Sequence, residues 1–154
     1  MIMVLNDVLT KQNVITQVLL KDGDKELPKA LKVKIMRMRM AYNKIKQQFD
    51  SDTQEFTKEL IPEELQTLAN KTDRTEEENV RFEELNNKVN SEYQEFMIQK
   101  GMEEVSETIN DTFTIDEYSE ILDVNSGNDV EFNGNKIKAA DFMEIVYSLF
   151  VKED

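Results

Sequence analysis

A heptad pattern of apolar residues between positions 31 and 49 constrains the fold more than any other feature of this chain. Apolar or aromatic side chains recur there at alternating spacings of four and three residues: Leu31, Ile35, Met38, Tyr42, Ile45 and Phe49. This spacing keeps one side of an α-helix turned toward a partner helix, as in a coiled coil. Pro28 suits the start of the helix, because its missing N–H would be unpaired there anyway. Asp52 takes the next seam position and the pattern resumes at Phe56, so we expect the helix to break or loosen at about residues 50–53.

A second long helix is predicted from Thr75 onward. Thr75 and Glu78 have the spacing of a capping box, in which each side chain accepts a hydrogen bond from the other residue's backbone N–H. Gly101 suits the end of this helix, since glycine readily adopts the conformation that closes helices. Pro62 interrupts the chain between the two long helices, and a short helix is expected from there to about Asn70. The two long helices are therefore expected to pack antiparallel.

The N-terminal segment predicts one shorter helix. Asn6 can cap a helix over about residues 7–21, and Asp22-Gly23-Asp24 is expected to end it. Near the other end of the chain, Thr114 and Glu117 repeat the capping-box spacing ahead of a short helix that runs to about residue 122.

The C-terminal part predicts the only β-structure. Asn133-Gly134 lies between two short alternating runs within residues 130–137, which is the strongest local indication of a tight β-hairpin. Asp141 is expected to cap a final apolar helix. The fold class is therefore mainly α with α+β character at the C-terminus: an antiparallel pair of long helices, a short N-terminal helix, and a β-hairpin plus helix. We expect a helical region over residues 1–100 and a small subdomain over residues 101–154 packed on it.

Composition argues against most enzyme classes. The chain has no His and no Cys, which removes the commonest general base, the commonest metal ligand and any thiolate site. Its four glycines form no phosphate-binding loop. We expect no catalytic residues, no cofactor, no metal and no enzymatic activity. The apolar start, Met1–Leu5, is too short for a signal peptide, and no segment has the ~20 apolar residues of a membrane span.

Residues 29–46 contain seven basic side chains and no acid, in a chain of formal net charge −13. This segment allows two interpretations. In the first, it pairs with the predicted helix over residues 76–96, whose seven acids outnumber its two bases, and opposite charge fixes the register. In the second, one row of side chains faces outward and binds another protein: Val33, Met36, Arg37 and Met40. Methionine adapts to varied partner surfaces and arginine is enriched at interfaces. Direct nucleic-acid binding is disfavoured, because the net negative charge opposes it.

The acidic remainder of the chain also has two interpretations. Twenty-eight of the acids follow residue 46. They can serve simply as a solvated surface that keeps the protein soluble. Alternatively, they can imitate the phosphates of nucleic acid and inhibit an enzyme that binds it.

Two short stretches carry a resemblance. Lys25-Glu26-Leu27-Pro28 precedes a long helix rich in Lys and Met, and Asp141-Phe142-Met143-Glu144-Ile145 follows the hairpin. Together they resemble a group of small helical proteins of unknown function encoded by tailed bacteriophages. The resemblance covers most of the chain in outline. It implies a phage protein of the virion or host cytoplasm that acts by binding proteins, either virion proteins or copies of itself. The implied role is a virion-associated structural or assembly component, and the alternative is an acidic inhibitor of a host defence or nucleic-acid enzyme.

Overall fold

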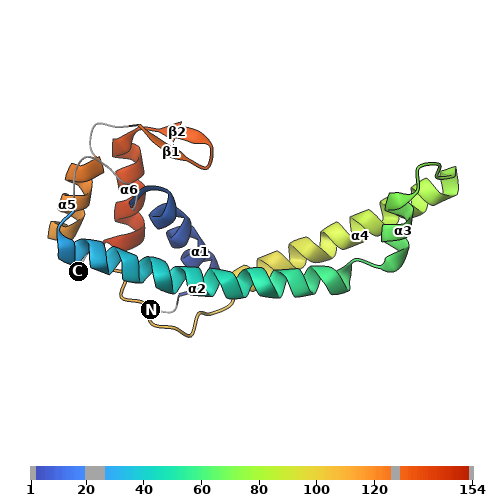
Figure 1. The fold of residues 1–154 in the computed structure, drawn as a ribbon, viewed down its shortest axis with the longest axis horizontal. Coiled ribbons are helices and arrows are strands. Elements are labelled where there is room, and N and C mark those ends of the chain that lie inside the picture. Colours follow the sequence, from blue (N-terminus) through green and yellow to red (C-terminus); the bar gives the residue numbers. More distant parts are fainter. Residues whose placement is uncertain (1–2, 20–26, 126–128, 153–154) are drawn as a thin grey trace. The chain divides into compact units, whose positions relative to one another are not determined.

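The computed structural model describes residues 3–19, 27–125 and 129–152, and it is mainly helical with one two-stranded antiparallel sheet near the C-terminus, as the sequence predicts (Figure 1). Contacts divide the chain into two compact units. Met1–Leu5 and Gln47–Glu104 form one, here called the paired-helix unit. Asn6–Lys46 and Val105–Asp154 form the other, here called the core unit. The sequence predicts one boundary, between residues 100 and 101, and the contacts divide the chain at three places, 5/6, 46/47 and 104/105.

The core unit contains most of the shorter elements. They are α1 (Leu5–Val14, which begins one residue before the unit), the π-helix η1 (Ile15–Leu19), the first part of α2 (Lys29–Leu60), α5 (Ile115–Asn125), β1 (Val130–Phe132), β2 (Asn135–Ile137) and α6 (Ala139–Phe150). The N-terminal helix is present, but Asn6 lies inside α1 and not at its cap, and the helix widens into a π-turn at Ile15. The expected stop at residues 22–24 lies outside the described residues.

The predicted heptad seam fills the centre of the core unit. Its first five positions, Leu31 to Ile45, are all buried. Helix α6 contributes a second set of buried side chains, namely Phe142, Met143, Val146 and Phe150. Helices α5 and α6 pack against each other (Figure 1). Since α6 is apolar on most of its surface, burial of this face supplies much of the free energy that holds the unit together.

The β-hairpin has the predicted turn. Strands β1 and β2 pair antiparallel with Val130 opposite Ile137 and Phe132 opposite Asn135. Asn133 and Gly134 have φ values of 51° and 79°, and a two-residue turn of this type requires positive φ at both positions. The predicted cap of the last helix is wrong by three residues: α6 begins at Ala139, and Asp141 lies in its first turn. A carboxylate in that turn still favours the helix, because the helix N-terminus carries partial positive charge.

The paired-helix unit consists of the end of α2, α3 (Glu63–Asn70) and α4 (Glu76–Gly101). The Phe56 and Phe96 rings are stacked with centroids 4.0 Å apart, and Lys100 Nζ lies 3.1 Å from Asp52 Oδ2. Because the higher-numbered residue of α2 meets the lower-numbered residue of α4, the two helices run antiparallel, as predicted.

The predicted break near Asp52 is wrong, since α2 is continuous from Lys29 to Leu60. Asp52 accepts a hydrogen bond from Gln48 Nε2 at 2.8 Å in addition to its ion pair with Lys100. A polar residue at a seam position is tolerated there because it has partners on its own helix and on α4.

The contacts of Phe56 and Asp52 also set the register of the helix pair. They place the acid-rich end of α2 beside the last turns of α4, and this register would carry residues before Gln47 beyond Gly101. The interpretation in which residues 29–46 pair with the acids of residues 76–96 is therefore wrong. In the basic segment it is the apolar seam, from Leu31 to Ile45, that is buried.

Two predicted capping boxes are confirmed. Glu78 N donates to Thr75 Oγ1 at 3.2 Å while Thr75 N donates to Glu78 Oε1 at 3.1 Å. Thr114 and Glu117 make the same pair of bonds at 3.1 and 2.9 Å. The predicted short helix after Pro62 is also present as α3, and its Leu65 and Leu68 bury against Leu85 of α4.

Candidate protein-binding face

Helix α2 is apolar on two opposite sides within the core unit. The buried seam occupies one side, and the row predicted from sequence occupies the other. The exposed fractions are 41% for Val33, 54% for Met36 and 67% for Met40, and Arg37 is also exposed. These four residues, called here the outer α2 face, lie within about two helical turns, so they form one continuous strip. The structure therefore brings the four predicted residues together on the surface.

The outer α2 face is positively charged. Lys29 and Lys44 fall on the same side of the helix and are exposed, and no acid occurs between residues 27 and 49. Arg37 makes no ion pair with any residue in the described part of the chain. Three exposed apolar side chains among exposed cations form a surface suited to a partner that is both apolar and acidic.

A polar clamp holds the opposite side of α2 in place. Asp111 is only 7% exposed, and its Oδ2 accepts hydrogen bonds from Lys11 Nζ at 2.8 Å and from the hydroxyl of fully buried Tyr42 at 2.5 Å. Burial raises the pKa of the Tyr42 hydroxyl above its usual range, and the hydrogen bond to the Asp111 carboxylate raises it further. Tyr42 therefore stays protonated and keeps donating. The clamp joins α1, α2 and the segment before α5.

A second anchor lies near the start of α2. Lys34 Nζ donates to the carbonyl oxygen of Thr112 at 2.6 Å and to Glu117 Oε1 at 2.9 Å. The next residue, Phe113, is buried, and its N–H donates to the carbonyl of Phe150 at 2.8 Å. One basic side chain of the segment thus turns inward and is used for folding, while Arg37 remains available on the outside.

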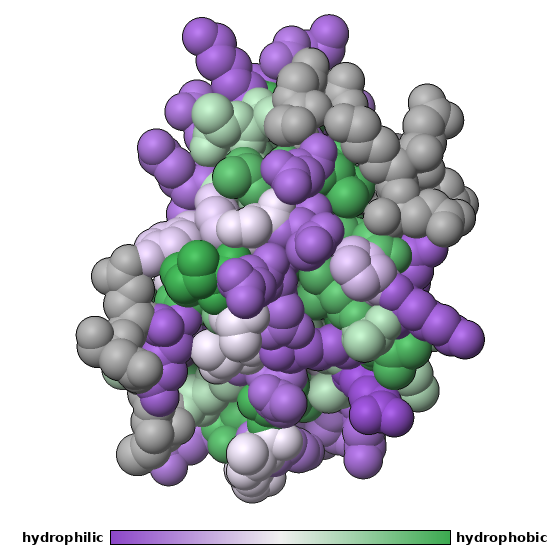
Figure 2. Space-filling model, turned by 90° about the vertical axis from the view of Figure 1, so that its left-hand side faces the viewer, coloured by the Kyte–Doolittle hydropathy of each residue, from purple (hydrophilic) through white to green (hydrophobic). Residues whose placement is uncertain are grey.

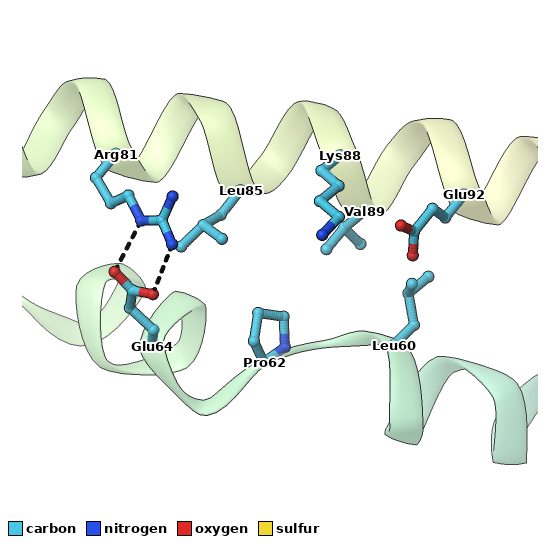
Figure 3. Close-up of a pocket in the computed structure, with 8 residues that line it drawn as sticks. All are labelled: Leu60, Pro62, Glu64, Arg81, Leu85, Lys88, Val89 and Glu92. Atoms are coloured by element: carbon cyan, nitrogen blue, oxygen red, sulfur yellow. Dashed lines mark hydrogen bonds and ion pairs between the residues drawn. The ribbon is translucent and has the colours of Figure 1, made fainter.

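A pocket of about 260 Å³ lies in the paired-helix unit (Figure 3). Its apolar lining comes from Leu60, Pro62, Leu85 and Val89. At one end Arg81 donates to both oxygens of Glu64, at 2.9 and 3.1 Å, and this hydrogen bond lowers the pKa of the Glu64 carboxyl. Figure 3 shows the charged ends of Lys88 and Glu92 also pointing toward the pocket. Opposite charges at one apolar opening do not favour a ligand of either sign.

The described residues offer no metal site: among them, no group of three or more Asp or Glu side chains is placed to hold an ion. Nor is any helix in those residues both long and apolar enough to cross a membrane. Other exposed apolar residues of the core unit include Ile115 and Leu122 of α5. On the α5 side of the molecule, hydrophilic side chains divide the hydrophobic surface into separate areas (Figure 2). Among the exposed apolar residues of this unit, those of the outer α2 face therefore form the best candidate for a protein-binding site.

Sequence reasoning found the outer α2 face but missed the clamp. A tyrosine at a seam position signals that a buried hydroxyl needs an acceptor. The sequence offers many carboxylates, however, and nothing in the spacing singles out Asp111, which is 69 residues from Tyr42. Comparisons with protein-family models, curated proteins and solved structures found no match.

Proposed function

We propose that this chain is a non-enzymatic protein of a tailed bacteriophage that acts by binding other proteins. Its proposed role is a virion-associated structural or assembly component, such as an auxiliary head, head–tail or tail protein. The observation that supports this proposal is the outer α2 face, where Val33, Met36 and Met40 expose apolar surface beside the exposed guanidinium of Arg37. Contiguous exposed apolar side chains of this kind are typical of interaction sites.

The chemistry of the face favours a protein partner. The phosphates of nucleic acid could pair with the cations of this face, but they make no favourable contact with its three apolar side chains. The net charge of −13 also repels nucleic acid. Flexible methionines and an arginine suit the centre of a protein interface. The phage context rests on the resemblance of the Leu27-Pro28 and Asp141–Ile145 stretches, and the proposed location is the virion or the host cytoplasm.

The proposal is tested by quantitative mass spectrometry of gradient-purified particles of the encoding phage. A virion component is expected at a constant ratio to the major capsid protein. A phage carrying Met36→Asp with Met40→Asp should incorporate far less of the chain, because two carboxylates on the outer α2 face remove its apolar surface. Ile115→Asp is a matched control, since Ile115 is similarly exposed but lies on α5. Absence of the wild-type chain from particles contradicts the virion role.

One observation favours a second candidate, an acidic inhibitor of a host defence or nucleic-acid enzyme. The paired-helix unit contains sixteen acids and six basic residues, a net charge of −10. An inhibitor that imitates nucleic acid binds its target through such carboxylates, so its affinity should fall steeply as salt is added. An affinity that is insensitive to salt contradicts this candidate.

A further inference from the structure

We infer that a second copy of this chain occupies the outer α2 face, through a patch at the end of α4. This inference rests on the proposed function, because it takes the outer α2 face as a protein-binding surface and names its partner. The patch, called here the α4-end patch, consists of Glu95, Ile98 and Met102. Ile98 is 64% exposed and Met102 is 69% exposed, and Glu95 is exposed as well.

The α4-end patch has the chemistry that the outer α2 face lacks. Residues three and four apart share one side of a helix, so Glu95, Ile98 and Met102 form a strip. Lys100, the cation closest along the chain, pairs elsewhere: its Nζ lies 3.1 Å from Asp52 Oδ2 and 3.0 Å from Glu103 Oε2. The exposed strip is therefore apolar and acidic, whereas the outer α2 face is apolar and basic.

Charge complementarity extends beyond the two strips. The paired-helix unit, which contains the α4-end patch, has a net charge of −10, and the region around the outer α2 face has no acid from residue 27 to residue 49. Like faces would bring like charges together, so pairing of two outer α2 faces or of two α4-end patches is disfavoured. The complementary pairing is heterologous: one surface of each copy meets a different surface of the next.

A heterologous contact leaves a free surface at each end of a pair, so it continues into rings or longer assemblies. The two strips are small, which places the contact near the low end of interface sizes, below about 1,200 Å². We therefore expect association that is weak, reversible and dependent on protein concentration. Many such contacts acting together hold an assembly through avidity.

The test is sedimentation analysis of the full chain and two variants. Variant one is Met36→Asp with Met40→Asp, and variant two is Ile98→Gln with Met102→Gln, whose neutral side chains do not attract the new carboxylates of variant one. The wild type should increase in average mass beyond a dimer as concentration rises. Each variant alone should stay monomeric with wild-type helicity, because each has lost one of the two surfaces. Mixed together, they should form a dimer, because the intact α4-end patch of variant one can bind the intact outer α2 face of variant two. The dimer should not grow further, because its remaining surfaces are the mutated ones.

Val80→Gln is the matched control for variant two. Val80 is 54% exposed on the same helix, but it lies 18 residues before Ile98, or about 27 Å along the axis, so its replacement should leave association unchanged. A wild type that stays monomeric at every concentration overturns the inference, as does a mixture of the two variants that fails to associate. Neither result contradicts the proposed function, because that proposal is tested by incorporation of the chain into particles.

Discussion

The two units of this chain share one helix but are stabilised differently. Every hydrophobic side chain described at 2% exposure or less lies in the core unit, from Val8 to Phe150. The best-buried residues of the paired-helix unit, such as Leu65, Leu68 and Leu85, keep 6 to 7% exposure, and its aromatic stack is only half-buried. The paired-helix unit instead has exposed ion pairs, including Lys71–Glu78 and Arg81–Glu64.

One continuous helix, α2, therefore contributes to a well-buried core in one unit and to a more exposed helix pair in the other. Burial of apolar area is the larger and more dependable source of stability, at roughly 25 cal/mol per Å². Exposed ion pairs contribute little and weaken with salt. The stability of the core unit should therefore change little with salt and pH, whereas the stability of the paired-helix unit should depend on both. Three of the four tyrosines, Tyr42, Tyr118 and Tyr147, belong to the core unit, so near-UV circular dichroism reports mainly on that unit.

The largest expected effect tests the core unit directly. Phe142 is fully buried and contacts Phe132 edge-on, with ring centroids 5.8 Å apart. Phe142→Ala should lower the free energy of unfolding by about 3–5 kcal/mol, because it leaves a large cavity. Urea unfolding followed by near-UV circular dichroism measures the loss. Ile98→Ala, at an exposed site, should stay within about 0.5 kcal/mol of wild type. A small loss for Phe142→Ala would contradict the assignment of the main core to this unit.

The polar clamp provides the next largest effect. Asp111→Ala removes the acceptor of both Lys11 and Tyr42 and should cost about 3 kcal/mol, at the lower end for breaking a buried pair because Lys11 keeps some exposure. Asp111→Asn should cost less, since its amide oxygen still accepts the Tyr42 hydrogen bond. The same near-UV unfolding experiment compares the two variants. Equal losses for Ala and Asn would mean that the carboxylate charge, and not the hydrogen bond, holds the clamp.

The hairpin should show an effect of intermediate size. Gly134→Val should cost about 1–2 kcal/mol, because a β-branched residue is strained at a φ of 79°. A Cβ atom there would have no neighbouring atom within 4 Å, so backbone strain is the main expected effect. Gly134→Asn is the control, since asparagine tolerates positive φ better than other residues. Thermal melting measures both, and identical melting temperatures for Val and wild type would contradict the observed turn.

The aromatic stack tests the paired-helix unit in the same way. Phe56→Ala removes a stacked ring pair worth about 0.5–1.5 kcal/mol, in addition to its half-buried apolar area. We expect the far-UV signal of helix to melt at lower urea concentration while the near-UV transition stays in place. If both transitions shift to lower urea concentration, the two units unfold cooperatively. They would then differ in how they are packed but not in their separate stabilities.

Local signals in the sequence predicted much of this fold. The seam from Leu31 to Ile45, both capping boxes and the Asn133-Gly134 turn depend on spacing along the chain, and the structure confirms each. The outer α2 face was predicted on the same basis, since a second apolar row on a helix stands out in its periodicity. Its role as an interface remains a prediction.

Features that depend on distant residues could not be predicted. Asp52 of the continuous α2 pairs with Lys100, 48 residues away, and the clamp joins Lys11, Tyr42 and Asp111 from three separate segments. The interpretation that pairs the basic segment with the acidic helix over residues 76–96 assumes that opposite charge selects helix partners. The contacts of Phe56 with Phe96 and of Asp52 with Lys100 set a different register, and sequence spacing does not show which helices meet.

The smallest predicted effect is a pH dependence confined to the paired-helix unit. Hydrogen bonds from the Lys71 ammonium, at 2.6 Å, and from the Thr75 backbone N–H lower the pKa of Glu78 from 4.5 to about 2. A lowered pKa in the folded state means that the ionised carboxylate stabilises the fold. This contribution is fully present above about pH 4.5 and is lost as the pH falls toward 2. The N-terminal turn of α4 should then fray before the core unit responds.

Glu78→Gln separates this carboxylate from the other acids that titrate in the same range. Glutamine can still take part in a capping box, so α4 should form, but the position no longer titrates. Amide hydrogen exchange near the start of α4 should depend less on pH in the variant than in wild type. Added salt should weaken the Lys71 contribution and leave the Thr75 hydrogen bond, so the pKa of Glu78 should rise only part of the way to 4.5. A Glu78 carboxyl that titrates near 4.5 by NMR at low salt would show that the capping box and ion pair do not persist in solution. The order of the α3–α4 end of the unit would then depend on the apolar cluster of Leu65, Leu68 and Leu85.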